Sequence, residues 1–184
     1  RRAGAGGEAD GGLARGFEHR RPGALGAVFD DRPSPVDRFE AITDELVGNE
    51  QVPLALRYFG GAGLAHMQQY GTQLSTFAKI RAKASRHASN NPVALFRAVV
   101  TEEEVLATPV MWPGVMTRLM ACPPTCGAAA AIVCSAAFAQ RHGLDRSVRI
   151  KAQAMTTDRP VSFEARDLRE GVGFSMAREA AQEV

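Results

Sequence analysis

The sequence has few cysteines, and their arrangement excludes most metal and disulfide chemistry. Its 184 residues contain three cysteines, Cys122, Cys126 and Cys134, all within one short stretch, and four histidines scattered along the chain. A structural zinc site needs about four such ligands, usually in two close pairs. An odd cysteine count also argues against a disulfide framework. We therefore expect free thiols and no metal.

Long apolar runs and a strong charge of one sign are lacking as well. The longest uncharged stretch, about residues 121–140, is interrupted by Pro123, Pro124 and Gly127, which argues against a membrane span. The two N-terminal arginines precede glycine and charged residues instead of an apolar run, so no secretory signal is expected. A net charge of +2 is too small to indicate a nucleic-acid partner. These absences predict an intracellular chain, with 45% hydrophobic residues available to build a core.

The middle of the chain has helical spacing. Residues 36–47 predict a helix that Gly48 and Asn49 end. Residues 72–88 predict the strongest helix, with an apolar stripe of Leu74, Phe77, Ala78, Ile80 and Ala84. Thr101 and Glu104 form the pattern of a capping box for a short helix that runs through Ala107.

Residues 51–70 are also helical in pattern but contain three glycines, at positions 60, 61 and 63. Glycine costs a helix about 1 kcal/mol relative to alanine, so we expect a break or a close contact there. Dinucleotide binding is disfavoured, because the strand that should precede such a glycine motif is missing.

Strand patterns flank this helical part. Residues 13–17 predict a short strand, and the small apolar run 127–134 predicts a buried one. Ser135 is expected to cap a helix over 136–142, with Gly143 as its left-handed end. Residues 148–155 predict a further strand, and Ser175 the cap of a last helix. This succession favours an α/β layer with crossover connections.

Motifs along almost the whole chain resemble, in order, those of the sterol-carrier-protein-type thiolases of the thiolase superfamily. They are Gly6-Gly7-Glu8-Ala9-Asp10 with Gly16-Phe17-Glu18; Phe29-Asp30-Asp31-Arg32; His66-Met67 with Tyr70-Gly71-Thr72; Phe77-Ala78-Lys79-Ile80; Asn90-Asn91-Pro92; Cys122-Pro123 with residues 127–132; Ala152-Gln153 with residues 155–158; and Gly173-Phe174-Ser175-Met176.

The resemblance implies an α/β class and a partial thiolase fold, layered α/β/α/β/α in the intact family, with a large helical loop domain. It implies the end of the N-terminal half over residues 1–32, the loop domain over 33–121, a returning strand and helix over 122–147, and the start of the C-terminal half over 148–184. The implied chemistry is acyl transfer on 3-oxoacyl-CoA by a cysteine nucleophile and proton-handling histidines. The family's nucleophile lies before this segment and its histidines lie beyond it, so we expect no catalytic residue here and no activity from the chain alone.

The resemblance also implies where coenzyme A would bind. Lys79, Lys83 and Arg86 are expected near its phosphates, Cys122 beside its pantetheine arm, and His66 matches the family in identity. Cys126 stands where the family usually has aspartate, and as a replacement nucleophile it lacks a neighbouring histidine in the sequence.

Three readings of function remain open. One is a piece of an acyl-CoA acyltransferase of lipid or sterol side-chain oxidation, and another is a non-catalytic protein that binds lipid, coenzyme A or a partner. The third is a truncated reading frame whose product is unstable and has no function. The expected ligand is acyl-CoA or a lipid, and the intact protein is expected to be a homodimer or part of a complex. The expected location is the cytoplasm, or the peroxisome in a eukaryote. Because strands of this chain would leave unpaired edges, we also expect the chain alone to aggregate or to need a partner.

Overall fold

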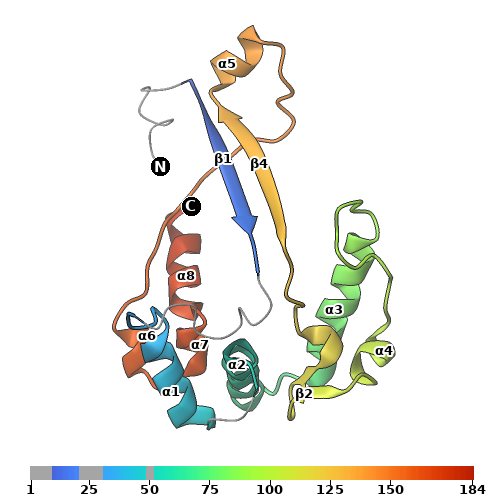
Figure 1. Ribbon diagram of the computed structural model, residues 1–184, viewed down its shortest axis with the longest axis vertical. Helices are drawn as coiled ribbons and strands as arrows, with labels where there is room; N and C mark the ends of the chain where they lie inside the picture. Colours follow the sequence, from blue (N-terminus) through green and yellow to red (C-terminus); the bar gives the residue numbers. More distant parts are fainter. Residues whose placement is uncertain (1–9, 21–30, 49–51) are drawn as a thin grey trace. The chain divides into compact units, whose positions relative to one another are not determined.

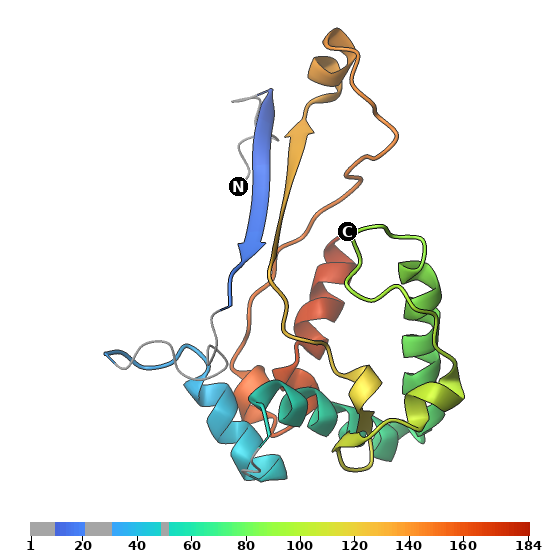
Figure 2. The same ribbon diagram turned by 45° about the vertical axis from the view of Figure 1, so that its right-hand side comes forward.

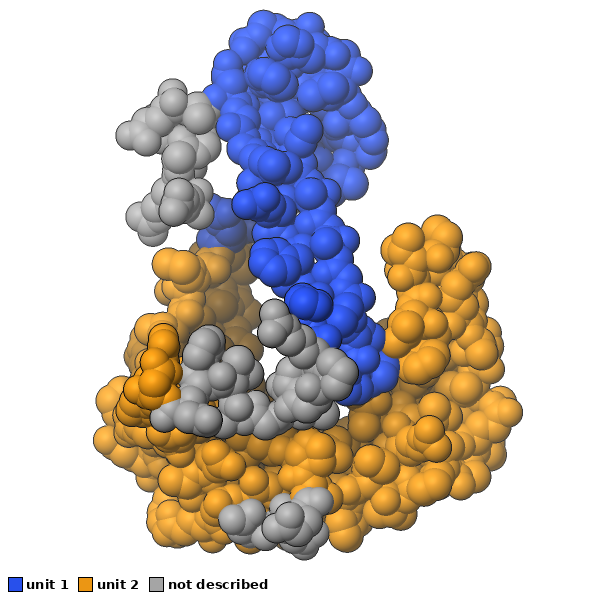
Figure 3. Space-filling view, in the orientation of Figure 1, with its two compact units in different colours: residues 1–26, 123–153 blue, residues 27–122, 154–184 orange. Residues whose placement is uncertain are grey.

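The computed structural model describes residues 10–20, 31–48 and 52–184. The chain divides into two compact units (Figure 3). The first contains residues 1–26 and 123–153, and the second contains residues 27–122 and 154–184. Both units mix helices with strands (Figure 1), which confirms the mixed α/β class. The predicted motifs at residues 6–9 and at Phe29 and Asp30 lie outside the described residues.

The first unit is built on a two-stranded antiparallel ribbon of β1 (Gly11–Glu18) and β4 (Gly127–Cys134). The register runs without interruption from Gly11 opposite Cys134 to Glu18 opposite Gly127. Both predicted strands are therefore confirmed, although they pair antiparallel with each other across the whole helical part of the sequence.

The expectation that residues 127–134 are buried was wrong. Seven of the eight residues of β4 are exposed and only Cys134 is partly covered. Small apolar side chains are suited to the inside of a sheet, but among the described residues β1 is the one strand that pairs with β4. A ribbon of two strands has no second layer to cover its faces.

A short helix, α5 (Ala136–Arg141), follows β4 as predicted. The Ser135 hydroxyl accepts a hydrogen bond from the Phe138 amide at 3.1 Å, and Gly143 adopts a left-handed φ of 62°. Asp10 ties this helix to the start of β1, because its carbonyl accepts from the Ser135 amide at 2.9 Å and its carboxylate pairs with Arg141 at 2.7 Å. The start of α5 is therefore bonded to the residue that precedes β1.

The strand predicted over residues 148–155 does not form. The segment has no regular secondary structure, and most of its residues are exposed. A strand needs a neighbour for its backbone hydrogen bonds, and no described strand lies beside this segment.

The second unit begins with two helices, α1 (Asp37–Val47) and α2 (Leu54–Tyr70). The buried Arg57 of α2 joins them, because its guanidinium pairs with Asp44 of α1 and donates to the Gly48 carbonyl at 3.3 Å.

The three glycines do not break α2, which is continuous. Of the two expected alternatives, the close contact is the one that the structure shows. A Cβ built on Gly60 would lie 2.5 Å from the Trp112 ring, one on Gly61 would lie 2.2 Å from Leu168, and one on Gly63 would lie 2.7 Å from Val115. Glycine lowers the stability of the helix, but it lets two other segments, around residues 112–115 and at Leu168, approach the helix backbone.

The predicted strong helix is α3 (Leu74–Ala88), and its buried residues are Ala78, Ala82 and Ser85. Ile80 is exposed, so its assignment to the buried stripe was wrong: it lies two positions from Ala78 and therefore points to another side of the helix. The capping box forms as predicted at the start of α4 (Glu102–Leu106), with Thr101 and Glu104 each accepting from the other's amide at 3.2 and 2.8 Å.

Several short elements complete the second unit. A small hairpin of β2 (Val110–Trp112) and β3 (Met116–Thr117) is followed by a 3₁₀ turn, η2 (Arg118–Met120). Three helices come from the C-terminal segment: α6 (Val161–Glu164), α7 (Leu168–Gly171) and α8 (Phe174–Glu183). The predicted cap at Ser175 was wrong, because α8 begins at Phe174, one residue before that serine. Gly173, at a left-handed φ of 92°, precedes the helix.

Candidate functional site

A row of cations lies on one side of α3. Lys79, Lys83 and Arg86 follow each other at spacings of four and three residues, so they share one helix face, and all three are exposed. The helix contains no acidic residue, and Arg86 lies in its last turn, where the helix dipole favours a positive charge. The predicted coenzyme-binding cations are thus brought together on an open surface.

The other side of α3 is fixed to its neighbours, which holds this row toward solvent. The buried Ser85 hydroxyl donates to the Ala82 carbonyl at 2.7 Å and accepts from the Val100 amide at 3.0 Å. Arg81 donates from Nε to the Leu119 carbonyl at 2.8 Å. Arg81 is therefore an anchor, in contrast to the cations of the open row.

Cys122 lies close in sequence to Leu119, the residue that Arg81 contacts. The Arg81 bond holds η2 against α3, and Cys122 follows Leu119 by three residues as an exposed free thiol. Within the described part of the chain, no hydrogen bond joins Cys122 to Lys79, Lys83 or Arg86. The structure places Cys122 in the same unit as the cations without pairing it with them.

His66 lies on α2 and is exposed. Its ring packs on the Tyr70 ring one turn later, with centroids 4.7 Å apart, and Arg169 lies over that same Tyr70 ring at 5.8 Å. The contacts of His66 therefore lead toward α7, and none among the described residues leads to the cations of α3.

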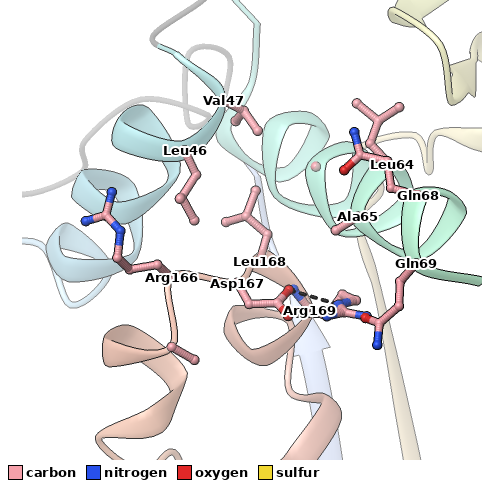
Figure 4. A pocket seen from close by; sticks show the side chains of 12 residues that line it. Leu46, Val47, Leu64, Ala65, Gln68, Gln69, Arg166, Asp167, Leu168 and Arg169 are labelled. Atoms are coloured by element: carbon pink, nitrogen blue, oxygen red, sulfur yellow. Dashed lines mark hydrogen bonds and ion pairs between the residues drawn. The ribbon is translucent and has the colours of Figure 1, made fainter.

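A groove of about 620 Å³ runs between α1, α2 and the α6–α7 segment (Figure 4). Its apolar wall consists of Leu46 and Val47 from α1, Leu64 and Ala65 from α2, and Leu168 from α7. Leu168 reaches this position because the missing side chain of Gly61 leaves room for its Cδ1. The groove can therefore accept an apolar chain.

The polar rim of the groove is already neutralised. Arg169 pairs with Asp167 and donates to the Gln69 side chain, while Arg166 pairs with Glu45 (Figure 4 shows the bond between Arg169 and Asp167). The Arg169 guanidinium holds the pKa of the half-buried Asp167 carboxyl below its ordinary value of 3.8. Because each cation has an acidic partner, the rim is poorly suited to bind a phosphate.

Sequence reasoning did not find this groove. Leu168 and Arg169 belong to a four-residue helix that Asp167 caps, and this helix is too short to give a periodic apolar pattern. One local signal was present: Asp167 is a good N-cap residue, and its side chain accepts from the Arg169 amide at 2.9 Å.

The three thiols show no arrangement for catalysis or metal binding. The described residues contain no cluster of His, Cys, Asp or Glu that could hold a metal ion. Cys126 accepts a hydrogen bond from the Arg20 amide at 3.2 Å, so its thiol joins the two chain segments just beyond the paired strands.

No described helix has the length and apolar character needed to cross a bilayer. No protein-family model matches the chain.

Comparison with curated proteins gives relatives over nearly the whole chain. Sterol carrier protein 2 of Homo sapiens is 42% identical over 178 residues, which are 96% of this chain and 32% of that protein. Non-specific lipid-transfer protein-like 2 of Caenorhabditis elegans is 32% identical over 183 residues, 94% of this chain and 43% of that protein. Acetyl-CoA acetyltransferase of Methanothermobacter thermautotrophicus is 37% identical over 105 residues, 56% of this chain and 26% of that protein.

The chain spans about a third of the length of the sterol carrier proteins that it matches. The expected likeness to sterol carrier proteins is confirmed, and the likeness to a thiolase-type enzyme is confirmed over a shorter stretch. The chain is therefore similar, from end to end, to one segment of sterol carrier protein 2 and, in part, to an acetyl-CoA acetyltransferase.

Proposed function

We propose that the chain is part of a thiolase-like acyltransferase that acts on 3-oxoacyl-CoA, with a partial thiolase fold and no catalytic residue of its own. The observation that carries this proposal is the similarity over 105 residues to an acetyl-CoA acetyltransferase. The ordered thiolase-like motifs, from Gly16-Phe17-Glu18 to Gly173-Phe174, agree with it. On this proposal the nucleophile and the proton-handling histidines come from residues outside the chain.

The proposed task of this chain is to hold coenzyme A. The row formed by Lys79, Lys83 and Arg86 would attract the phosphates, because its three charges lie on one face without an acidic residue on the same helix. Arg86 can offer two parallel N–H donors to a phosphate, whereas the lysines act as point charges. Cys122 and His66 are proposed as bordering residues on the strength of the family resemblance alone.

Calorimetry with coenzyme A tests the row directly. An exposed ion pair contributes about 0.2–1 kcal/mol, and reversing a charge adds repulsion, so Lys79→Glu with Lys83→Glu should weaken binding about tenfold or more. The matched control is Arg149→Glu with Lys151→Glu, which makes the same change of net charge in the first unit. Equal affinities for the parent chain and the Lys79/Lys83 variant would remove the row from the site.

Inactivity of the chain is tested separately. Purified chain mixed with a 3-oxoacyl-CoA and free coenzyme A should release no shortened acyl-CoA. Turnover that disappears in a Cys126→Ser variant would instead make Cys126 the nucleophile and contradict the proposal.

A second candidate function is non-catalytic lipid binding, and the groove between α1, α2 and α7 favours it. Its apolar wall suits a fatty acyl chain, and its paired rim suits a neutral polar group. Ala65→Trp should fill the groove and weaken binding of a fluorescent fatty acid about tenfold. Ala55→Trp, at an exposed position of the same helix, is the control. Binding that survives Ala65→Trp unchanged would place the lipid elsewhere.

A further inference from the structure

The segment after α3 exposes large apolar side chains on a short loop. Val93 is 87% exposed, Leu95 62%, Phe96 55% and Val99 56%. The chain leaves the end of α3 here and turns back along the helix toward α4 (Figures 1 and 2). The second unit has a formed core beside this loop, with Val105 and Ala78 fully buried, yet these four side chains stay outside it.

Hydrogen bonds fix the backbone of this loop. The Asn91 side chain accepts from the Val93 amide at 3.1 Å, and its carbonyl accepts from the Ala94 amide at 3.2 Å. Arg97 donates to the Ser89 carbonyl at 3.1 Å, which ties the loop to the end of α3. The exposed apolar side chains therefore lie on a loop whose backbone is held by hydrogen bonds.

The loop and the helix before it carry charge of one sign. From Leu74 to Thr101 the sequence has no aspartate or glutamate, whereas Arg86 and Arg97 flank the apolar residues and Lys79 and Lys83 continue the charge along α3. Acidic residues begin only at Glu102, beyond the loop, and the Glu104 carboxylate is turned back to the Thr101 amide by the capping box. Apolar side chains among cations form the combination that anionic lipid surfaces attract.

We propose that this loop, residues 92–99 with Arg86, docks the protein on the surface of a membrane that contains anionic lipids. Val93, Leu95 and Phe96 would enter the boundary between headgroups and acyl chains, while Arg86 and Arg97 would meet the lipid phosphates. A second copy is the less suitable occupant, because a symmetric contact through this loop would bring its arginines together. Arg86 is shared with the coenzyme proposal, whereas Val93, Leu95 and Phe96 belong to the docking proposal alone, so substitutions of these apolar residues test docking separately.

Vesicle co-sedimentation of the full chain tests the proposal, with vesicles of phosphatidylcholine alone or mixed with phosphatidylserine. We expect binding to the mixed vesicles that is at least tenfold tighter than to neutral ones and that weakens as salt is raised. Leu95→Ser with Phe96→Ser should reduce it about tenfold or more. Val148→Ser with Ile150→Ser is the matched control, since these apolar residues are 91% and 65% exposed in the first unit.

A Phe96→Trp variant gives a second readout. The fluorescence emission of its indole should shift to shorter wavelength on mixed vesicles, and brominated acyl chains should quench it. The native Trp112 is buried and serves as the internal reference. Equal binding to neutral vesicles, an equal loss in the Val148/Ile150 control, or no quenching at position 96 would each overturn the proposal. So would a Leu95/Phe96 variant that changes the oligomeric state of the protein without vesicles, because the loop would then be an interface between copies.

Discussion

A Cβ added to Gly60 in the middle of α2 would lie 2.5 Å from Cδ1 of Trp112 and 2.7 Å from its Cγ. The indole is buried, so it has no free space into which it could retreat. The closest approach of the β2–β3 hairpin to α2 therefore depends on the absence of a single side chain.

We expect Gly60→Ala to destabilise the second unit, although alanine is the better helix former by about 1 kcal/mol. Forcing a methyl group into a filled core costs typically about 1–3 kcal/mol, and the rigid ring offers little relief. Trp112 is the single tryptophan of the chain, so its fluorescence reports the thermal unfolding of this unit. Gly12→Ala is the control, because nothing lies within 4 Å of a Cβ at that position. If the thermal unfolding midpoint of Gly60→Ala equals or exceeds that of the parent chain, the Trp112 ring does not fill the space beside Gly60.

Acid should weaken the ion pair at the start of α7. The pKa of Asp167 is lowered in the folded chain, first by its bond to Arg169, so the folded state holds its proton less tightly than the unfolded state does. The resulting stabilisation is present above the ordinary pKa of 3.8 and is lost as pH falls through the lower, folded value. We expect the difference in unfolding free energy between the parent chain and Asp167→Asn to shrink across that window. A difference that stays constant from neutral pH downward would contradict the pairing.

The ribbon of the first unit should make the purified chain self-associate. Leu13, Phe17 and Ile132 are all exposed, and Leu13 lies opposite Ile132 in the ladder, so one face carries their apolar side chains. An isolated ribbon of two strands is marginally stable and offers its edges to other chains. Sedimentation velocity over a range of concentrations should show association, and Phe17→Lys with Ile132→Lys should reduce it. A monodisperse monomer with a cooperative thermal unfolding transition would refute this expectation. The homodimer expected of the intact protein is a separate prediction, and its test uses the longer chain.

Sequence reasoning found the elements whose signals are local. The capping box at Thr101, the serine cap at position 135 and the glycine stop at 143 all act through groups within a few residues of each other. Long helices such as α3 were found for the same reason, since their buried residues recur with a fixed period.

The errors concern features that depend on distant parts of the chain. The alternation of Val148 and Ile150 fits a strand, but a strand also needs a partner, and none is described beside it. The glycines of α2 indicated either a break or a contact, and the partners that decide the question, Trp112 and Leu168, lie far along the sequence. Of the candidate site, the α3 cations could be predicted to share a face from their spacing, whereas the groove could not be foreseen because its walls come from helices at both ends of the second unit.

The bond between Gln69 and Arg169 joins residues 100 positions apart, and the Gly61–Leu168 contact beside it spans a similar length. A ribosome adds about 5–20 residues each second, so the helices α1 and α2 emerge roughly 5–20 s before the segment that covers them. During that interval the side of α1 and α2 that α7 later covers faces water or another molecule. Nascent chains should therefore depend on chaperone binding at this surface until α7 has been synthesised.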